Sequence, residues 1–262
     1  MSSDEARTRP PFKEEPSRQA GQSLRERIKT LEDQFAEQGI LVGVSLGMTM
    51  YAWLIWFLPK YSPLIPTIIL MCIYVWVAPK LIRARKELKN RRQGHKGEVI
   101  VGQKLDELRG KGVFVLHDVL FRNFNIDHVV VSKGGVFAIE TKSWSKPMRG
   151  STEIFQEEKS LRKPSGFVDV ETIPQAEFQA KRLRKLIKEL TGMTPDVMPV
   201  VVIPGWCIKT KAGSSPPLVP VLHESYLASH LLHQPERLEE GDVRRIYERL
   251  SENQRDFAPV DP

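Results

Sequence analysis

Three side chains suited to phosphodiester chemistry lie on two consecutive strand-like runs. Asp127 lies in the run 125–131, and Glu140 and Lys142 lie in the run 135–142, with a glycine pair at the turn between them. Both runs are rich in β-branched and aromatic residues, so they are expected to form a β-hairpin. Because side chains alternate along a strand, Glu140 and Lys142 project to the same side. Carboxylates are preferred ligands of Mg²⁺ and Mn²⁺, and an adjacent lysine can hold or deprotonate a metal-bound water. The pattern predicts a metal-dependent hydrolytic site.

The setting of these charges makes the pattern informative. A Glu-x-Lys spacing alone is common on strands and usually marks a solvated ion pair. Here the charges lie within runs of Val, Ile and Phe, where a carboxylate is tolerated when it is paired or bound to a metal. The apolar surroundings therefore favour a functional site over an exposed ion pair.

The segments around this hairpin predict an α/β domain from residue 94 to residue 252. Their order is a helix, three strands, a helix opened by Pro174, a continuous apolar strand at 197–203, a short apolar stretch and two further helical stretches. This order favours a mixed central sheet flanked by helices. Residues 253–262 are expected to form a tail.

Four ordered motifs in this region resemble the nuclease-related domain, or NERD, a family placed among the restriction-endonuclease-like PD-(D/E)xK folds. The resemblance covers roughly residues 94–203. It implies an α/β fold with a restriction-endonuclease-like mixed sheet flanked by helices. The motifs are Gly94-x-x-Gly97-Glu98, Asn125-Ile126-Asp127-His128, Gly135-Val136-Phe137-x-Ile139-Glu140-Thr141-Lys142-x-Trp144 and the helix that contains Gln175.

The resemblance also implies roles for the charged residues. Asp127 and Glu140 would be ligands of Mg²⁺ or Mn²⁺, and Lys142 would position the attacking water. Glu98 would complete or extend the metal site from the preceding helix. The implied substrate is DNA or RNA.

A glutamine is implied to orient a ligand or the substrate phosphate. Gln175 matches the motif, although Pro174 directly precedes it, which departs from the usual Asn-Pro-x-x-Gln spacing of the family. Gln179 lies one helical turn further on the same face, so it competes with Gln175 for this role.

Two apolar stretches before this domain predict a transmembrane helical hairpin over residues 40–79. The stretch 40–58 holds 19 uncharged residues and the stretch 61–78 holds 18, joined by Pro59-Lys60. Each is long enough to cross a hydrocarbon core of about 30 Å as a helix.

A polybasic juxtamembrane linker, residues 80–96, follows the second stretch. It holds eight Lys or Arg and one Glu, so it carries the whole formal net charge of +7. The bias of basic residues predicts a multi-pass protein of the cell (inner or cytoplasmic) membrane, with both termini and the nuclease-like domain in the cytoplasm. The basic residues are also expected to contact anionic lipid headgroups.

The segments before the first stretch are less specific. Residues 1–22 are expected to form a disordered tail, and residues 23–39 an amphipathic helix that lies on the membrane, pairs with another helix or continues into the first span. Gly43 and Gly47 form a small-xxx-small pattern, which favours close packing within the hairpin or with another copy as a homo-oligomer.

These observations lead to two hypotheses of different classes. The first is a membrane-anchored, metal-dependent nuclease that hydrolyses DNA or RNA on the cytoplasmic side. The alternative is a non-catalytic module that binds nucleic acid or a protein partner at the membrane. Fold alone does not distinguish them.

Overall fold

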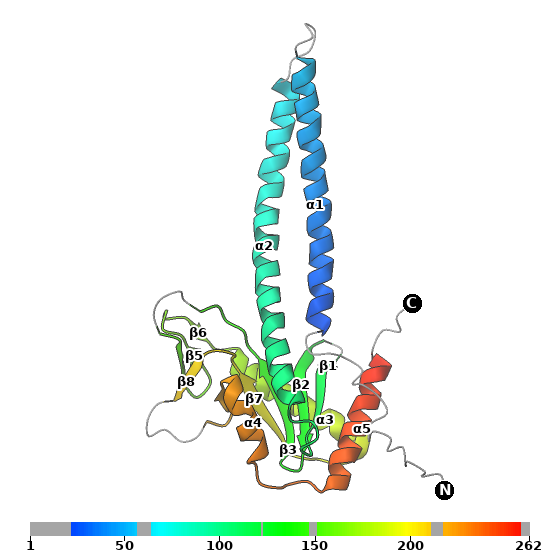
Figure 1. Cartoon of the computed structure of the whole chain (residues 1–262), viewed down its shortest axis with the longest axis vertical. Helices are drawn as coiled ribbons and strands as arrows, with labels where there is room; N and C mark the ends of the chain where they lie inside the picture. Colours follow the sequence, from blue (N-terminus) through cyan, green and yellow to red (C-terminus); the bar gives the residue numbers. More distant parts are fainter. Residues whose placement is uncertain (1–21, 57–63, 122, 147–150, 211–216, 258–262) are drawn as a thin grey trace, which may run out of the picture.

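A long helical hairpin extends from a mixed α/β domain (Figure 1). The computed structural model describes residues 22–56, 64–121, 123–146, 151–210 and 217–257. The mixed α/β architecture predicted from the order of apolar segments is confirmed. The connector of the hairpin, residues 1–21 of the expected N-terminal tail and residues 258–262 of the expected C-terminal tail lie outside the described residues.

The hairpin consists of two continuous helices, α1 (Gln22–Ile55) and α2 (Leu64–Asp106). The expected amphipathic segment 23–39 continues into the first apolar stretch without a break. The expected linker 80–96 is likewise helical, so α2 runs from the apolar stretch into the α/β domain. Because α1 and α2 are antiparallel, the start of α1 and the end of α2 lie at the same end, beside that domain (Figure 1).

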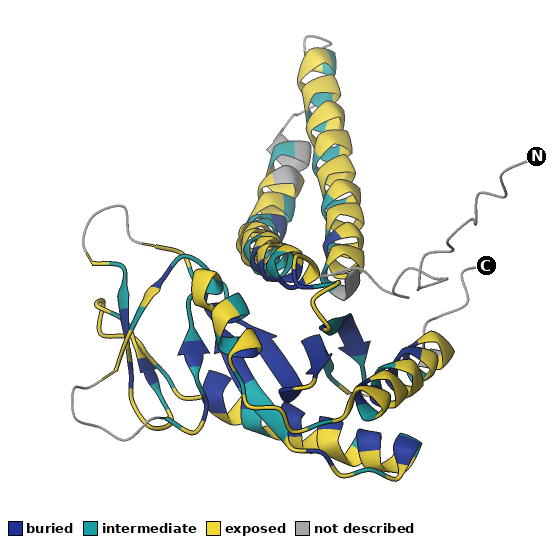
Figure 2. Ribbon diagram, turned by 60° about the horizontal axis from the view of Figure 1, so that its bottom comes forward, coloured by how far each residue is buried: buried dark blue, intermediate teal, exposed yellow. Residues whose placement is uncertain are grey.

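Contacts along the hairpin join its two helices at both ends. At the distal end, Trp53 Nε1 donates to Thr67 Oγ1 at 3.1 Å. At the end near the α/β domain, Arg92 forms an ion pair with Glu32. Between these contacts, many large apolar residues are exposed, and Figure 2 colours most of the hairpin as exposed. Both helices are long and apolar enough to cross a membrane by length and composition.

The α/β domain is built on a five-stranded sheet of order β1-β2-β3-β7-β9. The first three strands are antiparallel, whereas β3, β7 and β9 are parallel. The strands are β1 (Phe114–Leu120), β2 (Asn125–Ser132), β3 (Gly135–Thr141), β7 (Val197–Val202) and β9 (Val221–Leu222).

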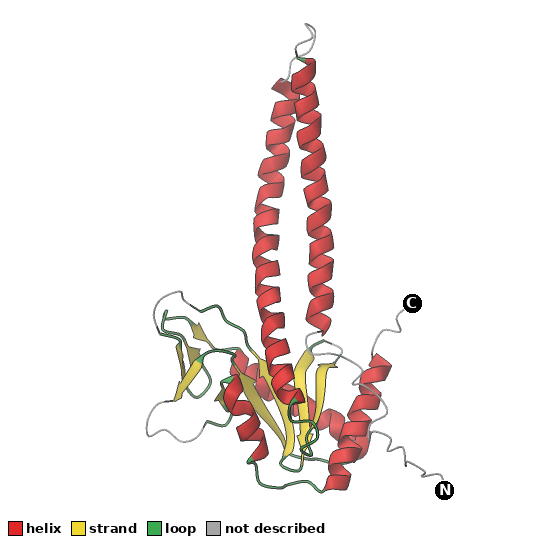
Figure 3. Ribbon diagram, in the orientation of Figure 1, coloured by secondary structure: helices red, strands yellow, loops and turns green. Residues whose placement is uncertain are grey.

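Helices cover both faces of this sheet, as Figure 3 illustrates. One face packs against α3 (Thr172–Thr191) and α5 (Glu240–Phe257), and the other packs against the end of α2 and against α4 (Glu224–Leu232). The left-handed Gly192, with φ of 77°, ends α3. Helix α5 reaches Phe257, so it extends beyond the expected domain boundary at residue 252.

A second sheet of four strands lies beside the first, in a region where the sequence predicted no elements. Its order is β6-β5-β4-β8, and it packs on the start of α3 and on β7 through a shared apolar cluster. The strands are β4 (Glu153–Gln156), β5 (Leu161–Arg162), β6 (Val168–Asp169) and β8 (Cys207–Thr210).

Candidate active site

Two glutamines from α3 hold the carboxylate of Glu140. Gln175 Nε2 donates to Glu140 Oε1 at 2.9 Å, and Gln179 Nε2 donates to Glu140 Oε2 at 2.7 Å. The sequence presented these glutamines as competitors, but the structure uses both, because they lie one turn apart on the same face of the helix. Glu140 is buried near the end of β3, so its orientation is fixed by these two bonds.

The start of α3 is itself fixed by Asp169. Its Oδ1 accepts a hydrogen bond from the backbone N–H of Thr172 at 2.9 Å and a longer one from Glu171 at 3.2 Å. A carboxylate at a helix start satisfies otherwise unpaired N–H groups and is stabilised by the helix dipole. The helix that delivers the two glutamines is thereby anchored to the second sheet, where Asp169 ends β6.

Asp127 lies opposite Glu140 on the neighbouring strand. The pairing of His128 with Ile139 sets this register, and Asp127 Oδ2 accepts a hydrogen bond from the backbone N–H of Thr141 at 2.7 Å. The two predicted carboxylates therefore lie on adjacent strands at the same end of the sheet.

The regular alternation of β1 and β2 is interrupted where Asp118 faces Asp127. These two residues lie between the pairs His117–His128 and Val119–Ile126, and Asp118 has a φ of 51°. A non-glycine residue in this left-handed region is strained and is common at functional sites.

Asp118 is a carboxylate that the sequence reasoning missed. It is 3% exposed, Asn125 Nδ2 donates to its Oδ1 at 3.0 Å, and Gln254 Nε2 of α5 donates to its carbonyl oxygen at 3.2 Å. The available signal was an aspartate within the apolar run Phe114–Leu120, but nothing in that run indicated which strand it would face.

Helix α2 brings Glu98 to this end of the sheet because Gly97 allows a very close approach. A Cβ at position 97 would lie 1.7 Å from Ser143 Oγ and 3.0 Å from Ser143 Cβ. A side chain at 97 would therefore force the helix away from the segment after β3. A further bond, from Ser145 Oγ to Gln93 Oε1 at 2.6 Å, joins the same two segments.

Burial and mutual repulsion raise the pKa values of the predicted carboxylates. Burial, followed by the charges of Asp118 and Glu140, raises the pKa of Glu98 to about 7. Burial also raises the pKa of Asp127 well above its usual value, and Glu140 and Glu98 add to the shift. The pKa of Glu140 is raised by burial, although the bond from Gln179 and the charge of Lys142 oppose the increase. These groups are close enough to repel one another.

Lys142 follows β3 and contributes the positive charge nearest to Glu140 among the causes of its pKa shift. Its backbone N–H donates to Val202 O at 2.9 Å, which continues the parallel pairing of β3 with β7 by one residue. The side chain is half-buried. Glu140 and Lys142 therefore lie at the same end of β3, within electrostatic range of each other.

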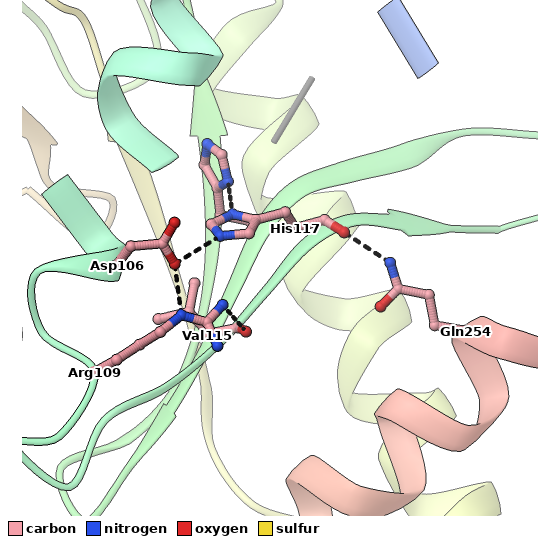
Figure 4. Close-up of polar contacts among 6 residues, drawn as sticks. Asp106, Arg109, Val115, His117 and Gln254 are labelled. Atoms are coloured by element: carbon pink, nitrogen blue, oxygen red, sulfur yellow. Dashed lines mark hydrogen bonds and ion pairs between the residues drawn. The ribbon is translucent and has the colours of Figure 1, made fainter. Parts of the chain in front are cut away.

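A polar network lies on the other face of β1 and β2 (Figure 4). Asp106, the last residue of α2, accepts hydrogen bonds from Arg109 and, at 3.1 Å, from His117 Nε2. His117 Nδ1 lies 2.9 Å from His128 Nδ1, so one ring donates to the other. Burial lowers the pKa of both histidines, so neither ring is readily protonated. This network fixes the end of α2 against the sheet.

The donor chemistry of the site fits a hard divalent cation. Within the described residues, no three His, Cys, Asp or Glu side chains are gathered tightly enough to enclose a metal ion. Mg²⁺ is commonly held by one or two carboxylates, with water and substrate phosphate completing its coordination. Asp127 and Glu140 supply such a pair, and a cation would relieve the repulsion that raises their pKa values.

The region that holds this site is similar to a known protein family. Residues 93–204 match the model of the nuclease-related domain, in agreement with the span indicated by the four sequence motifs. An uncharacterized protein of Bacillus anthracis is 32% identical over 84 residues, which cover 28% of this chain and 40% of that protein. The match thus spans less than half of that relative's length. No solved structure matches the chain. The matched span contains Glu98, Asp127, Glu140, Lys142, Gln175 and Gln179.

Proposed function

We propose that this nuclease-related domain hydrolyses phosphodiester bonds of DNA or RNA with Mg²⁺ or Mn²⁺ held by Asp127 and Glu140. The observation that carries the proposal is the group of mutually repelling, largely buried carboxylates beside Lys142. Such an arrangement is unfavourable for folding, because each charge is desolvated and repelled by the others. Groups of this kind are concentrated at catalytic and ion-binding sites.

Neighbouring groups of the chain orient the two carboxylates that would hold the cation. Gln175 and Gln179 fix the Glu140 carboxylate, and the Thr141 N–H fixes that of Asp127. A bound divalent cation supplies positive charge toward the phosphate and lowers the pKa of the attacking water. Because these carboxylates are held before substrate binds, little reorganisation is required during the reaction.

Two further groups are suited to holding the water and its proton. The Lys142 ammonium lies in the electrostatic range of Glu140 and donates to a water or to a phosphate oxygen. Glu98, whose pKa is raised to about 7 by burial and by neighbouring carboxylates, exchanges a proton near neutral pH. Glu98 therefore extends the site as a ligand or a proton carrier from α2.

The test of hydrolysis compares full-length protein in detergent with its Glu140→Ala and Lys142→Ala variants. Labelled single-stranded and double-stranded DNA and RNA are incubated with Mg²⁺, with Mn²⁺ or with EDTA. We expect cleavage that requires a divalent cation and is lost in both variants. Asp196→Asn is the matched control, because this carboxylate is exposed and far along the sheet at the start of β7. Cleavage that persists in both site variants would overturn the proposal.

A non-catalytic binding module is the second candidate. It is favoured by the observation that no three metal-ligating side chains converge within the described residues. Such a module would bind nucleic acid without a cation and without turnover, and its affinity would fall steeply as salt is raised. Cleavage that requires a cation would favour the nuclease, whereas salt-sensitive binding without cleavage would favour the binding module.

We further propose that the α1–α2 hairpin anchors the domain in a membrane, with both ends of the hairpin and the α/β domain on the cytoplasmic side. Large apolar side chains of the hairpin point outward; Met50 is 78% exposed and Val75 is 74% exposed. In water this surface would be unfavourable, whereas in lipid it is matched to its surroundings. The basic segment 80–96 would then lie at anionic headgroups.

Because α2 is continuous, the membrane anchor would also set the distance of the site from the bilayer. Lys80 and Glu98 are 18 residues apart on one helix, so Glu98 lies about 27 Å along the axis from the end of the apolar stretch. The site would be held at a fixed height above the bilayer. Flotation of the protein with vesicles tests the anchor, and vesicles that contain anionic lipid are expected to retain it more strongly than neutral ones. Protein that remains soluble without detergent would contradict it.

A further inference from the structure

The four-stranded sheet places two aromatic rings and a lysine next to the segment that follows Lys142. Lys163 Nζ lies 4.0 Å from the ring centroid of Trp144 and 4.6 Å from that of Phe167. The two rings are 6.2 Å apart and inclined at 80°. Phe167 is 51% exposed, so much of its ring is open to solvent. We refer to Trp144, Lys163 and Phe167 as the aromatic platform.

The platform is held in place by the backbone on both sides. Lys163 N–H donates to Phe167 O at 2.9 Å, and the turn between them closes through a bond from Gly166 N–H to Lys163 O at 3.0 Å. Gly166 has a φ of 83°, which suits glycine. On the other side, the Trp144 carbonyl accepts a hydrogen bond from the buried Trp206 at 3.1 Å. The three side chains are therefore presented in a defined arrangement.

The platform adjoins the proposed catalytic site. Trp144 lies two residues after Lys142 in the sequence. Burial lowers the pKa of Lys163, and the charge of Lys142 lowers it further, whereas Asp169 raises it. Asp169 also acts on Glu140. The ammonium groups of Lys163 and Lys142 thus lie within electrostatic range of each other.

Two properties of the platform indicate what it binds. Within the described part of the chain, Lys163 forms no ion pair, so its charge is available to a phosphate. The opposite face of the same sheet differs, because Arg162 there pairs with Glu157 at 2.9 Å. Exposed aromatic rings next to a lysine attract the flat faces of nucleobases, and bases stack on such rings when they are free of a duplex.

We propose that the aromatic platform binds an unpaired base and the adjoining phosphate of the strand that enters the site, so that single-stranded or frayed nucleic acid is preferred over intact duplex. This inference rests on the proposed function, since it identifies the substrate form for the same site. Phe167 offers the stacking surface, Lys163 contacts the phosphate, and Trp144 supports both from the side of Lys142.

The test measures binding separately from cleavage. Fluorescence anisotropy of a labelled single-stranded oligonucleotide, and of the same sequence as a duplex, is followed with full-length protein in detergent and EDTA. Stacking on aromatic side chains corresponds to about 5- to 150-fold in affinity per base. We expect Phe167→Leu to weaken single-strand binding within that range, with a much smaller effect on duplex, and Lys163→Ala to weaken single-strand binding through the lost phosphate contact. Phe167→Tyr, which keeps a stacking ring, is expected to retain wild-type affinity.

Phe155→Ala is the matched control. Phe155 is 46% exposed on the same sheet, but it is paired in register with Arg162 and Lys209 on the outer face. It is expected to leave binding unchanged. Melting temperatures of all variants verify folding, and Trp144 is left intact because it packs on the core near Trp206.

The outcomes separate this inference from the proposed function. If Phe167→Leu binds like wild type while Glu140→Ala still abolishes cleavage, the proposed role of the aromatic platform is wrong and the proposed nuclease activity is supported. If Phe167→Leu loses single-strand affinity while neither wild type nor any variant cleaves, the proposed role of the aromatic platform is supported and the proposed hydrolysis is wrong. Equal losses from Phe155→Ala and Phe167→Leu, or equal losses for duplex and single strand, would overturn the platform.

Discussion

The α1–α2 hairpin and the five-stranded sheet depart from the usual distribution of residues in opposite directions. The hairpin exposes large apolar side chains, whereas the sheet buries the carboxylates of Asp118 on β1 and Glu140 on β3. In a water-soluble domain, apolar groups are normally inside and charges outside. Both departures raise the free energy of the isolated chain in water, and each indicates a different environment that would compensate for it.

The chemistry of each region indicates that surrounding. Exposed apolar residues over two helices of membrane-spanning length match lipid. Buried carboxylates with raised pKa values match a cation. On the proposed functions, an apolar solvent would suit the hairpin, whereas a ligand of defined charge and position would suit the site. Substitutions in the hairpin should change the recovery of the protein in the membrane fraction. Substitutions in the site should change its cleavage activity.

The largest expected effect comes from Asp127→Asn. This change should lower the cleavage activity and raise the stability of the protein without metal. The amide keeps an acceptor for the Thr141 N–H but removes the charge. Loss of several kcal/mol of transition-state stabilisation corresponds to about a 10³-fold slower cleavage. Without metal, the variant should melt at a higher temperature than wild type, because one repelling charge is gone. Calorimetry with EDTA, beside cleavage assays with Mg²⁺, measures both.

A lower melting temperature of Asp127→Asn in EDTA would show that this carboxylate stabilises the fold, and the site would then resemble a structural ion pair. Asp196→Asn, an exposed carboxylate, should change neither quantity.

The hairpin is tested by Val75→Arg, a charge introduced on an outward-facing position that is 74% exposed. In water an arginine there would be harmless, whereas at the centre of a spanning helix it costs about 2.5–3.5 kcal/mol. We expect reduced recovery in the membrane fraction, measured by sedimentation and alkaline extraction. Ile100→Arg is the control, because Ile100 is 42% exposed on the same helix but beyond the apolar stretch. Equal membrane recovery of Val75→Arg and Ile100→Arg would mean that the apolar stretch responds to a charge no differently from the rest of α2, which would contradict the membrane anchor.

The sequence predicted the parts of the fold that local patterns encode. The β2–β3 hairpin, the helix that begins near Pro174 and the apolar strand at 197–203 are found as expected. Asp127 and Glu140 are adjacent because the two-glycine turn fixes the register of their strands, and register follows from turn geometry. The two helices of membrane-spanning length were evident from uninterrupted apolar runs.

Features that depend on tertiary contacts were not predictable from these patterns. The second sheet uses strands as short as the two residues of β5, which carry almost no periodic signal. Asp118 joins the site through a left-handed φ of 51°, a conformation that is uncommon for residues other than glycine and that nothing in the apolar run around it indicates. The choice between Gln175 and Gln179 depended on the distance of α3 from β3, and that distance permits both bonds.

The junction between the two regions is tested by Gly97→Ala, where the expected effect is intermediate. The new Cβ would overlap Ser143 Oγ, so α2 must shift away from the segment that follows Lys142. Overpacking of this kind costs about 1–3 kcal/mol, and a displacement near 1 Å of Glu98 can slow catalysis about 10²-fold. Ser143→Gly in the same chain removes both clashing atoms and should restore melting temperature and activity. Gly94→Ala, which meets the flexible Leu24 side chain at 3.2 Å, should be tolerated.

If Gly97→Ala alone leaves cleavage unchanged, then α2 does not need to lie against the Ser143 segment for activity, and Glu98 acts independently of this contact. The hairpin and the site would then be joined by the chain without being mechanically coupled.

The smallest expected effect is a pH dependence of stability that appears in the sheet region without metal. The pKa of Glu98 rises from 4.5 to about 7 on folding, because the folded state disfavours its charge. A group of this kind contributes stability below its unfolded pKa that is lost as the pH rises through its folded pKa. The free energy of unfolding in EDTA should therefore decrease between pH 5 and pH 7.5 by at most about 1.4 kcal/mol per pH unit.

Two comparisons isolate the origin of this slope. Glu98→Gln, which cannot ionise, should flatten the decrease, whereas added Mg²⁺ should oppose it most at the higher pH, where the carboxylates are free of protons and bind the cation best. A slope that is unchanged in Glu98→Gln would assign the titration to another group of the cluster, since Asp127 also has a raised pKa. A slope that persists at saturating Mg²⁺ would mean that the cation does not bind among these carboxylates, and the proposed ligand for the buried charges would have to be abandoned.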